Sequence, residues 1–395
     1  MQTPSHFIFL LISLLYFQLC HASSFQSYST VEIAPREQAL TFARISSQNQ
    51  FTTLGVVHYE NGQLRAVDLN DALNAPSLDP ISLFNSFGYE AIKSAIDESS
   101  STKILTVPAD QLTLPANFLQ THIAVGTNYK AHAEETDVTR TPFLFSKRVE
   151  PTAPYANVPL HSNALDWEVE LAFVPLKDLS ENIQPEFMGL ILTNDFSNRE
   201  VLMHNVDINH IESAKGFAEG KSGIGLLPVG NLFIIPKDFR TFSNNIALSL
   251  SVNDQLKQQA FSQQMIWDAD QILKEIWLAK DKTWNYQKNT IGLLENKDRL
   301  PARTLILSGT PEGTAFQGVP ISTKLKGVGK WIGSGFDSTV QFHVVNTYLE
   351  ESYKQKRFLQ VGDQVNIHAN YLGILSNIIG ERITSQPPAP QMGMQ

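Results

Sequence analysis

The chain has 395 residues, of which 42% are hydrophobic and 17% are charged, and its formal net charge is −9. This composition is that of a globular protein with a sizeable core and excludes a disordered chain. The acidic balance, with no run of basic residues, argues against a nucleic-acid-binding protein and against a binding face for anionic lipid.

The first residues contain an uncharged apolar segment, Phe7–Leu19, which is shorter than the roughly 20 residues of a membrane-spanning helix. Cys20-His21-Ala22 follows, with the small-x-small pattern of a signal-peptidase site. We therefore expect residues 1–22 to be a signal peptide, although Met1–His6 lacks Lys and Arg. The protein would then be exported, periplasmic or secreted, with no membrane contact after cleavage. The alternative is a buried core helix in a cytoplasmic protein.

The next region, residues 23–118, is predicted to be β-rich. From Phe51 the apolar residues alternate, and Asn61-Gly62 between two such runs predicts a hairpin. A short helix is expected over residues 88–100. Pro108 and Pro115 then mark a linker, so the length of the chain and this boundary predict a second domain over residues 119–382. The tail, 383–395, has the composition of a disordered segment.

Strands and short helices alternate in this second domain, which predicts a β-rich α/β fold. We expect strands at 123–126, 142–146, 166–174, 188–195, 231–236, 246–253, 305–309 and 364–370, and helices at 129–136, 197–206 and 261–279. The glycine-rich segment GVGKWIGSG (327–335) matches neither a P-loop nor a dinucleotide fingerprint, and is interpreted as a loop. GTPEG (309–313) follows an apolar strand and predicts a sharp turn.

Acidic and apolar residues alternate in the segment DWEVEL (166–171). On a strand, Asp166, Glu168 and Glu170 share one face at intervals of about 7 Å. Three like charges repel one another unless water or a cation compensates, so the segment is either a solvated acidic face or part of a cation site. Asp195 ends the next apolar run, where an acid often faces a cleft. Oxygen ligands of this kind favour Mg²⁺, Mn²⁺ or Ca²⁺, whereas nothing suggests zinc.

These acids are part of a wider pattern. DWEVELAFV followed by TNDFSNRE resembles the ExE…D metal-ligand pattern of the fumarylacetoacetate hydrolase superfamily, and further blocks resemble that family in the same order. The further blocks are VGTNYKAHAEE (125–135), PFLFSK (142–147), KSGIGLLPVG (221–230), VNDQLKQQ (252–259), ILSGTPEG (306–313) and VGDQVNIHANYLG (361–373). The resemblance spans about residues 122–380, most of the chain.

The resemblance implies that Glu168, Glu170 and Asp195 are the metal ligands, with Mg²⁺ or Mn²⁺ as the cation and Ca²⁺ as a further candidate. Asp166 would either position one of these metal-ligating carboxylates or face solvent. His132 and Glu135 match the catalytic pair of the family, and on a helix their spacing places them on one face. A polar surface helix is the alternative for that segment.

Lys221 matches the lysine that stabilises developing negative charge, with Lys215 as its rival. Substrate would contact Arg199, Lys147 and Thr310, although a structural ion pair is the alternative for Arg199. Leu202 stands where many family members carry a pocket Gln, so the substrate stays open.

The family implies a metal-dependent hydrolase that cleaves carbon–carbon bonds of 1,3-dicarbonyl or acylpyruvate-type keto acids through an enolate. The same site would serve a decarboxylase, isomerase or hydratase of 2-keto acids, and an exported, non-catalytic binding protein is the alternative from another class. The implied fold is a mixed β-roll with a smaller N-terminal β-rich domain, often as a homodimer. Residues 315–358 exceed the compact family core and are expected to be an insertion, whose aromatic residues Trp331, Phe336 and Phe342 pack on a neighbour.

Overall fold

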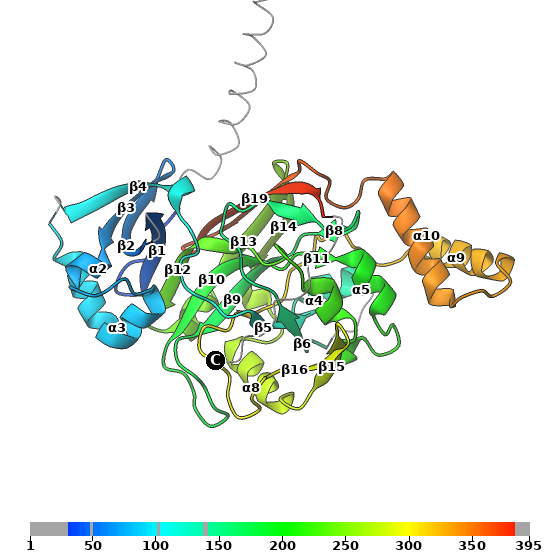
Figure 1. Cartoon of the computed structure of the whole chain (residues 1–395), viewed down its shortest axis with the longest axis horizontal. Coiled ribbons are helices and arrows are strands. Elements are labelled where there is room, and N and C mark those ends of the chain that lie inside the picture. Colours follow the sequence, from blue (N-terminus) through cyan, green and yellow to red (C-terminus); the bar gives the residue numbers. More distant parts are fainter. Residues whose placement is uncertain (1–30, 48–49, 101–102, 137–140, 384–395) are drawn as a thin grey trace, which may run out of the picture.

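The computed structural model describes residues 31–47, 50–100, 103–136 and 141–383 (Figure 1). The predicted signal peptide, and all but the first residue of the predicted tail, lie outside these ranges. Among the described helices, none has the length and apolarity that crossing a membrane requires.

A ten-stranded sheet runs through the molecule in the order β4-β3-β2-β1-β12-β10-β9-β17-β5-β6 (Figure 1). Neighbouring strands pair antiparallel, except that β17 pairs parallel with β5. The N-terminal strands join the rest through β1 and β12, where Phe42 lies opposite Phe233. The strands are β1 (Ala39–Ser47), β2 (Gln50–Glu60), β3 (Gln63–Asp68), β4 (Ile104–Pro108), β5 (Thr121–Gly126), β6 (Phe143–Arg148), β9 (Val169–Pro175), β10 (Met188–Asn194), β12 (Val229–Pro236) and β17 (Ile306–Leu307).

A five-stranded sheet, in the order β14-β13-β18-β19-β7, packs beside the large one. Its strand β13 contacts β9, and its strand β19 contacts β12. One continuous core fills the space between them, as expected when two sheets each bury an apolar face. This arrangement confirms a β-rich α/β fold. The strands are β7 (Val158–Leu160), β13 (Ala247–Val252), β14 (Gln255–Phe261), β18 (Gln364–Ala369) and β19 (Gly373–Arg382), with two small pairs, β8 (Leu165–Asp166) with β11 (Ser197–Asn198) and β15 (Thr283–Tyr286) with β16 (Asn289–Gly292).

The helices among the described residues are 4 to 18 residues long. They are α2 (Leu69–Ala72), α3 (Pro80–Asp97), α4 (Lys130–Glu135), α5 (Arg199–Asn205), α6 (Phe217–Lys221), α7 (Phe239–Ser243), α8 (Ala269–Leu278), α9 (Ile321–Gly333) and α10 (Val340–Lys354), with 3₁₀ turns η3 (Ala109–Gln111), η4 (Ile211–Ser213) and η5 (Ser262–Gln264).

Local signals account for several of these elements. The predicted hairpin at Asn61-Gly62 is confirmed, because both residues have positive φ (52° and 69°), as a tight two-residue turn requires. The helix expected at 88–100 instead begins at Pro80. Asp79 caps it through Ser82 N, Pro80 suits a first helical position, and the helix continues past a kink at Gly88.

Two sequence interpretations were wrong in their details. The helix expected over 261–279 begins only at Ala269, because Asp268 caps it there and residues 255–261 pair with β13 as strand β14. The segment 327–335 was interpreted as a loop, but its residues 327–333 form the second half of α9. Gly327 lets α9 approach α10 closely, since a Cβ there would lie 2.6 Å from Val344 Cα. This packing outweighs the low helix propensity of its glycines.

Helices α9 and α10 form most of the expected insertion and project from one end of the molecule (Figure 1). Of the aromatic residues noted there, Trp331 packs on Phe336, with ring centroids 4.6 Å apart, and Phe342 packs on His204 at 5.6 Å. These contacts lie within the α9–α10 segment and between α10 and α5.

Candidate metal centre

Two neighbouring strands bring three carboxylates together. Glu170 lies on β9, Glu168 directly precedes that strand, and Asp195 directly follows β10. The strands pair with Thr193 opposite Glu170, and Asp195 N donates to Glu168 O at 2.9 Å. One oxygen from each of the three carboxylates lies within 4.8 Å of the others, and each residue is at most 4% exposed. The structure therefore gathers the predicted ligand trio into one buried cluster.

The chemistry of this cluster fits a hard divalent cation. All three donors are carboxylate oxygens, which Mg²⁺, Mn²⁺ and Ca²⁺ prefer. Burial raises the pKa of Glu170 well above its ordinary value, and the charges of Asp195 and Glu168 raise it further. The charge of Lys221 lowers the pKa of Glu170 but does not outweigh these effects, and a bound cation would supply further positive charge.

Two lysines lie against the carboxylates. Lys221 Nζ donates to Glu168 Oε2 and to Asp195 Oδ2, the latter at 2.7 Å. Burial by itself lowers the pKa of Lys221, but Asp195 and Glu168 outweigh it and raise the pKa, so this lysine is charged. Lys215, the rival in sequence, is exposed and has no such contact among the described residues.

Lys147 lies behind Asp195. Its Nζ donates to Asp195 Oδ1 and to Leu226 O, and the side chain is fully buried. Lys147 does not line the cavity described below, whereas Lys221 does. This position fits compensation of the Asp195 charge better than contact with substrate, and the expected substrate contact stays a prediction.

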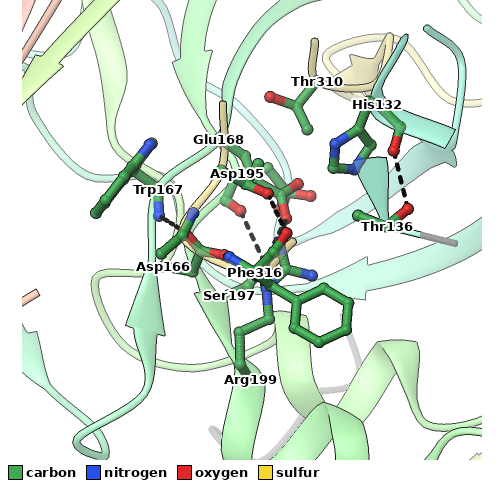
Figure 2. Close-up of polar contacts among 12 residues, drawn as sticks. His132, Thr136, Asp166, Trp167, Glu168, Asp195, Ser197, Arg199, Thr310 and Phe316 are labelled. Atoms are coloured by element: carbon green, nitrogen blue, oxygen red, sulfur yellow. Dashed lines mark hydrogen bonds and ion pairs between the residues drawn. The ribbon is translucent and has the colours of Figure 1, made fainter. Parts of the chain in front are cut away.

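Arg199 and Asp166 form a buried ion pair next to the trio (Figure 2). Arg199 Nε donates to Asp166 Oδ2 at 2.8 Å, and its Nη2 donates to Glu168 Oε1 at 2.6 Å. Asp166 also accepts the backbone N–H groups of Trp167, Ala315 and Phe316. Asp166 is therefore not solvated. The structural ion pair, which the sequence left open for Arg199, is present, and contact of Arg199 with a substrate carboxylate stays a prediction.

His132 and Glu135 lie on one face of α4. His132 Nδ1 is 3.4 Å from Glu135 Oε2, and Glu135 also accepts Gly313 N at 3.0 Å. Because Nδ1 faces Glu135, Nε2 is the imidazole nitrogen left for external chemistry. His132 lines the same cavity as Glu168 and Asp195 (Figure 2), so this helix is not a plain surface helix.

The turn GTPEG completes the site. Gly309 N donates to Glu170 Oε2 at 2.7 Å, which holds that carboxylate in place. Gly309 has a φ of 91°, and a Cβ there would lie 2.8 Å from Asn128 Cβ. Thr310, which lines the cavity, accepts a hydrogen bond from Gln258 Nε2 at 2.9 Å.

Sequence reasoning missed three residues that position the site. Gln258 supports Thr310, Asn128 Nδ2 donates to Ser308 O at 2.7 Å, and Ser197 Oγ donates to Glu168 Oε1 at 2.8 Å. Asn128 and Gln258 lie within the family-like blocks 125–135 and 252–259. Their place in these blocks was the only sequence signal for Asn128 and Gln258, because the groups that they contact come from distant segments of the chain.

These groups open into a cavity of about 600 Å³. Polar side chains line one part of it, and most of the remaining lining is apolar. Leu202 is one of the apolar lining residues, at the position where the resemblance leads one to expect Gln. The polar lining residues near the carboxylates are His132, Glu168, Asp195, Arg199, Lys221 and Thr310.

The chain is similar to known proteins over more than half of its length. The family model described as fumarylacetoacetate (FAA) hydrolase C-terminal matches residues 121–379. The chain is 26% identical over 247 residues to a mitochondrial oxaloacetate tautomerase of Bos taurus, covering 60% of this chain and 70% of that protein. It is 28% identical over 283 residues to a caffeoylpyruvate hydrolase of Neonothopanus nambi, covering 67% and 81% respectively.

The fold is also that of solved structures. A fumarylacetoacetate hydrolase from the psychrophile Exiguobacterium antarcticum matches with a TM-score of 0.55 and 19% identity, covering 87% of this chain and all of that one. The chain belongs to the fumarylacetoacetate hydrolase family and is an enzyme of that superfamily.

Proposed function

We propose that this member of the fumarylacetoacetate hydrolase family is a divalent-metal-dependent hydrolase that cleaves a carbon–carbon bond in acylpyruvate-type 1,3-dicarbonyl acids. One observation carries the proposal. His132, which Glu135 contacts, lines the same cavity as Lys221 and two carboxylates of the trio, Glu168 and Asp195. A general base beside a cation site is what the addition of water to a chelating dicarbonyl requires.

Glu168, Glu170 and Asp195 would hold the cation, which supplies Lewis-acid polarisation of the substrate oxygens when it is bound. His132 Nε2 takes a proton from water, while Glu135 orients the ring and stabilises the imidazolium that forms. General base catalysis of this kind contributes about 10²- to 10⁴-fold in rate.

The attacking water oxygen forms a bond to the acyl carbonyl carbon, and the bond from that carbon to the pyruvate methylene breaks. The electron pair of the broken bond passes to the enolate of pyruvate, which takes up a proton. The products are pyruvate and a carboxylic acid. Lys221, already charged beside Glu168 and Asp195, places its ammonium group where the negative charge of the enolate develops.

The main alternative is tautomerisation or decarboxylation of a 2-keto acid such as oxaloacetate on the same residues. The Bos taurus relative is named as an oxaloacetate tautomerase, so this reaction is a direct rival. The apolar lining of a 600 Å³ cavity favours the larger acylpyruvate over a small dicarboxylate. A purely binding role is disfavoured, because it gives no reason for a histidine held by a carboxylate and a charged lysine to line one cavity.

A substrate panel tests the proposal. The purified chain would be stripped of metal, reloaded with Mg²⁺ or Mn²⁺, and assayed with acetylpyruvate, with a longer acylpyruvate and with oxaloacetate. We expect loss of the dicarbonyl absorbance with equimolar release of pyruvate and acid. Faster turnover of oxaloacetate than of every acylpyruvate would refute hydrolysis as the main activity.

Matched variants test the base. We expect His132→Gln to lower kcat by about 10²-fold or more while metal binding is kept. Glu135→Gln should lower kcat less and alter the pH profile of kcat, because Glu135 acts through the imidazole. Glu134→Gln, an exposed neighbour on the same helix, is the control and should change neither. Equal losses in all three variants would show that the helix, and not the base, was disturbed.

Export and a homodimeric state remain proposals. The apolar segment 7–19 and the cleavage-site pattern at Ala22 support export, and the family resemblance supports the dimer. Sequencing the mature N-terminus and measuring the mass in solution by light scattering would decide each of them separately.

A further inference from the structure

We infer that the apolar part of the cavity is a subsite for a long apolar acyl group, built largely by helices α9 and α10. This inference rests on the proposed function and specifies the substrate class of the same site. Its basis is the cavity that begins at the carboxylates and extends between α5, the residues after α5, and the helical pair.

The size of the cavity exceeds what the reacting part of the substrate needs. About 600 Å³ is the scale of sites that enclose a drug-sized ligand, whereas a pyruvate unit has only three carbons. The reacting groups would contact His132, Lys221 and Thr310. The remaining lining is mostly apolar, although Lys324 of α9 and Gln341 of α10 also belong to it. Its apolar residues include Val206, Ile208, Val328, Val340, Val344 and Val345.

Hydrogen bonds tie the helical pair together and to the end of α5. Thr323 and Lys326 both bond to Glu351, which ties α9 to α10. Gln341 Nε2 donates to Met203 O at 3.2 Å and to Val206 O at 3.0 Å, which ties α10 to the end of α5. The apolar wall that these helices provide is therefore part of the folded cavity.

Phe316 joins this wall to the metal centre. Its ring packs on Tyr348 of α10, with centroids 5.6 Å apart, and lies 5.4 Å from the Arg199 guanidinium carbon. Phe316 also lines the cavity, and its backbone N–H bonds to Asp166 (Figure 2). Phe316 therefore provides apolar surface between the carboxylates and α10.

The apolar lining favours a ligand that carries an apolar chain. Ile208 is 56% exposed and Val340 is 36% exposed, so apolar surface lines the cavity while still open to water. A ligand chain that covers this surface gains about fourfold in binding for each buried methylene. A short acyl group gains nothing from this apolar surface.

Two probe series on the metal-loaded full chain test the inference. The first is a set of straight-chain acylpyruvates from acetyl to decanoyl, measured as kcat/KM. The second is a set of straight-chain 2-oxo acids of the same lengths, which carry the chelating group but no cleavable dicarbonyl bond, measured by calorimetry. We expect both to rise about fourfold per added methylene over the first several carbons, and then to level off as the cavity fills.

Variants locate the subsite. Val344→Trp fills the apolar part of the cavity, and we expect it to lower the decanoyl-to-acetyl ratio of kcat/KM at least tenfold. Asn346→Trp, on the same helix but outside the cavity lining, should leave that ratio unchanged. If Val344→Trp proves unstable, Val340→Asp is the second variant. It places a charge at the subsite while an acid in the first turn of α10 is favourable for the helix.

The outcomes separate this inference from the proposed function. If acetylpyruvate is cleaved but neither series rises with chain length, the subsite is refuted and the hydrolase stands. If no acylpyruvate is cleaved, the hydrolase is refuted, and the 2-oxo acids decide the subsite. Affinity that rises with length and falls in Val344→Trp supports the subsite, and affinity independent of length overturns it.

Discussion

Asp79→Asn tests how firmly the N-terminal region is attached to the rest of the chain. Asp79 caps α3 and accepts a forked pair of hydrogen bonds from Arg303 Nη1 and Nη2, together with Asn117 N. Burial by itself raises the pKa of Asp79, but Arg303 and Asn117 outweigh it and lower the pKa from its ordinary value of 3.8 to about 2. Asn keeps the helix cap, so the substitution removes the charge while retaining most of the local geometry.

The magnitude follows from the two pKa values. Their difference corresponds to about 2 kcal/mol of folding free energy at neutral pH. Because the pKa in the folded state is the lower one, this contribution is complete above the ordinary pKa of Asp79, and it is lost as the pH falls toward 2. We therefore expect Asp79→Asn to cost about 2 kcal/mol from pH 5 to 8 and progressively less below about pH 4.

Urea unfolding followed by tryptophan fluorescence and circular dichroism measures this difference, and coincident transitions would justify a two-state fit. A double-mutant cycle with Arg303→Gln should recover most of the loss as coupling energy. Asp281→Asn is the control, because Asp281 and Lys297 are 70% and 59% exposed, and such pairs contribute little. A cost that is the same at pH 3 and pH 7 would refute the electrostatic reasoning.

Three further predictions concern the site. Lys221→Met should lower kcat by about 10²- to 10³-fold, whereas the exposed Lys215→Met should leave activity and stability unchanged, and equal loss in both would contradict the assignment. Removing divalent ions with a chelator should abolish activity and lower the unfolding temperature. Mg²⁺ or Mn²⁺ at 100 times its Kd should restore about 2.7 kcal/mol of folding free energy. An unfolding temperature that does not change with metal would argue against the site. Gly309→Ala should cost about 1–3 kcal/mol and weaken metal binding, because a Cβ would clash with Asn128 at a φ of 91°. Gly335→Ala, with a φ of 74° but no atom within 4 Å, should cost less and spare the metal; thermal unfolding with and without metal compares the two.

Several features of this protein follow from short-range patterns in the sequence. Alternation along a strand predicts that Glu168 and Glu170 point the same way, and the acid at the end of the next apolar run predicts Asp195. The hairpin at Asn61-Gly62 is equally local, because the turn depends only on those two residues. The ordered family-like blocks add the fold and the class of enzyme. In each case the signal lies within a few neighbouring residues.

Other features depend on contacts between segments far apart in the chain. Local sequence does not show that Lys147, Lys221 and Arg199 all contact the acidic cluster. Nor does it show that the Asp166 carboxylate accepts hydrogen bonds from Arg199 and from the backbone N–H groups of residues 315 and 316. Helix α9 is the clearest case, because its glycines predict a loop and only packing against α10 makes the helix favourable. The same packing lines the apolar part of the cavity, so the subsite proposed for the acyl group could not be predicted from the sequence pattern. Local propensity is a sum over neighbours, whereas burial and charge compensation are set by whichever distant groups the fold brings into contact.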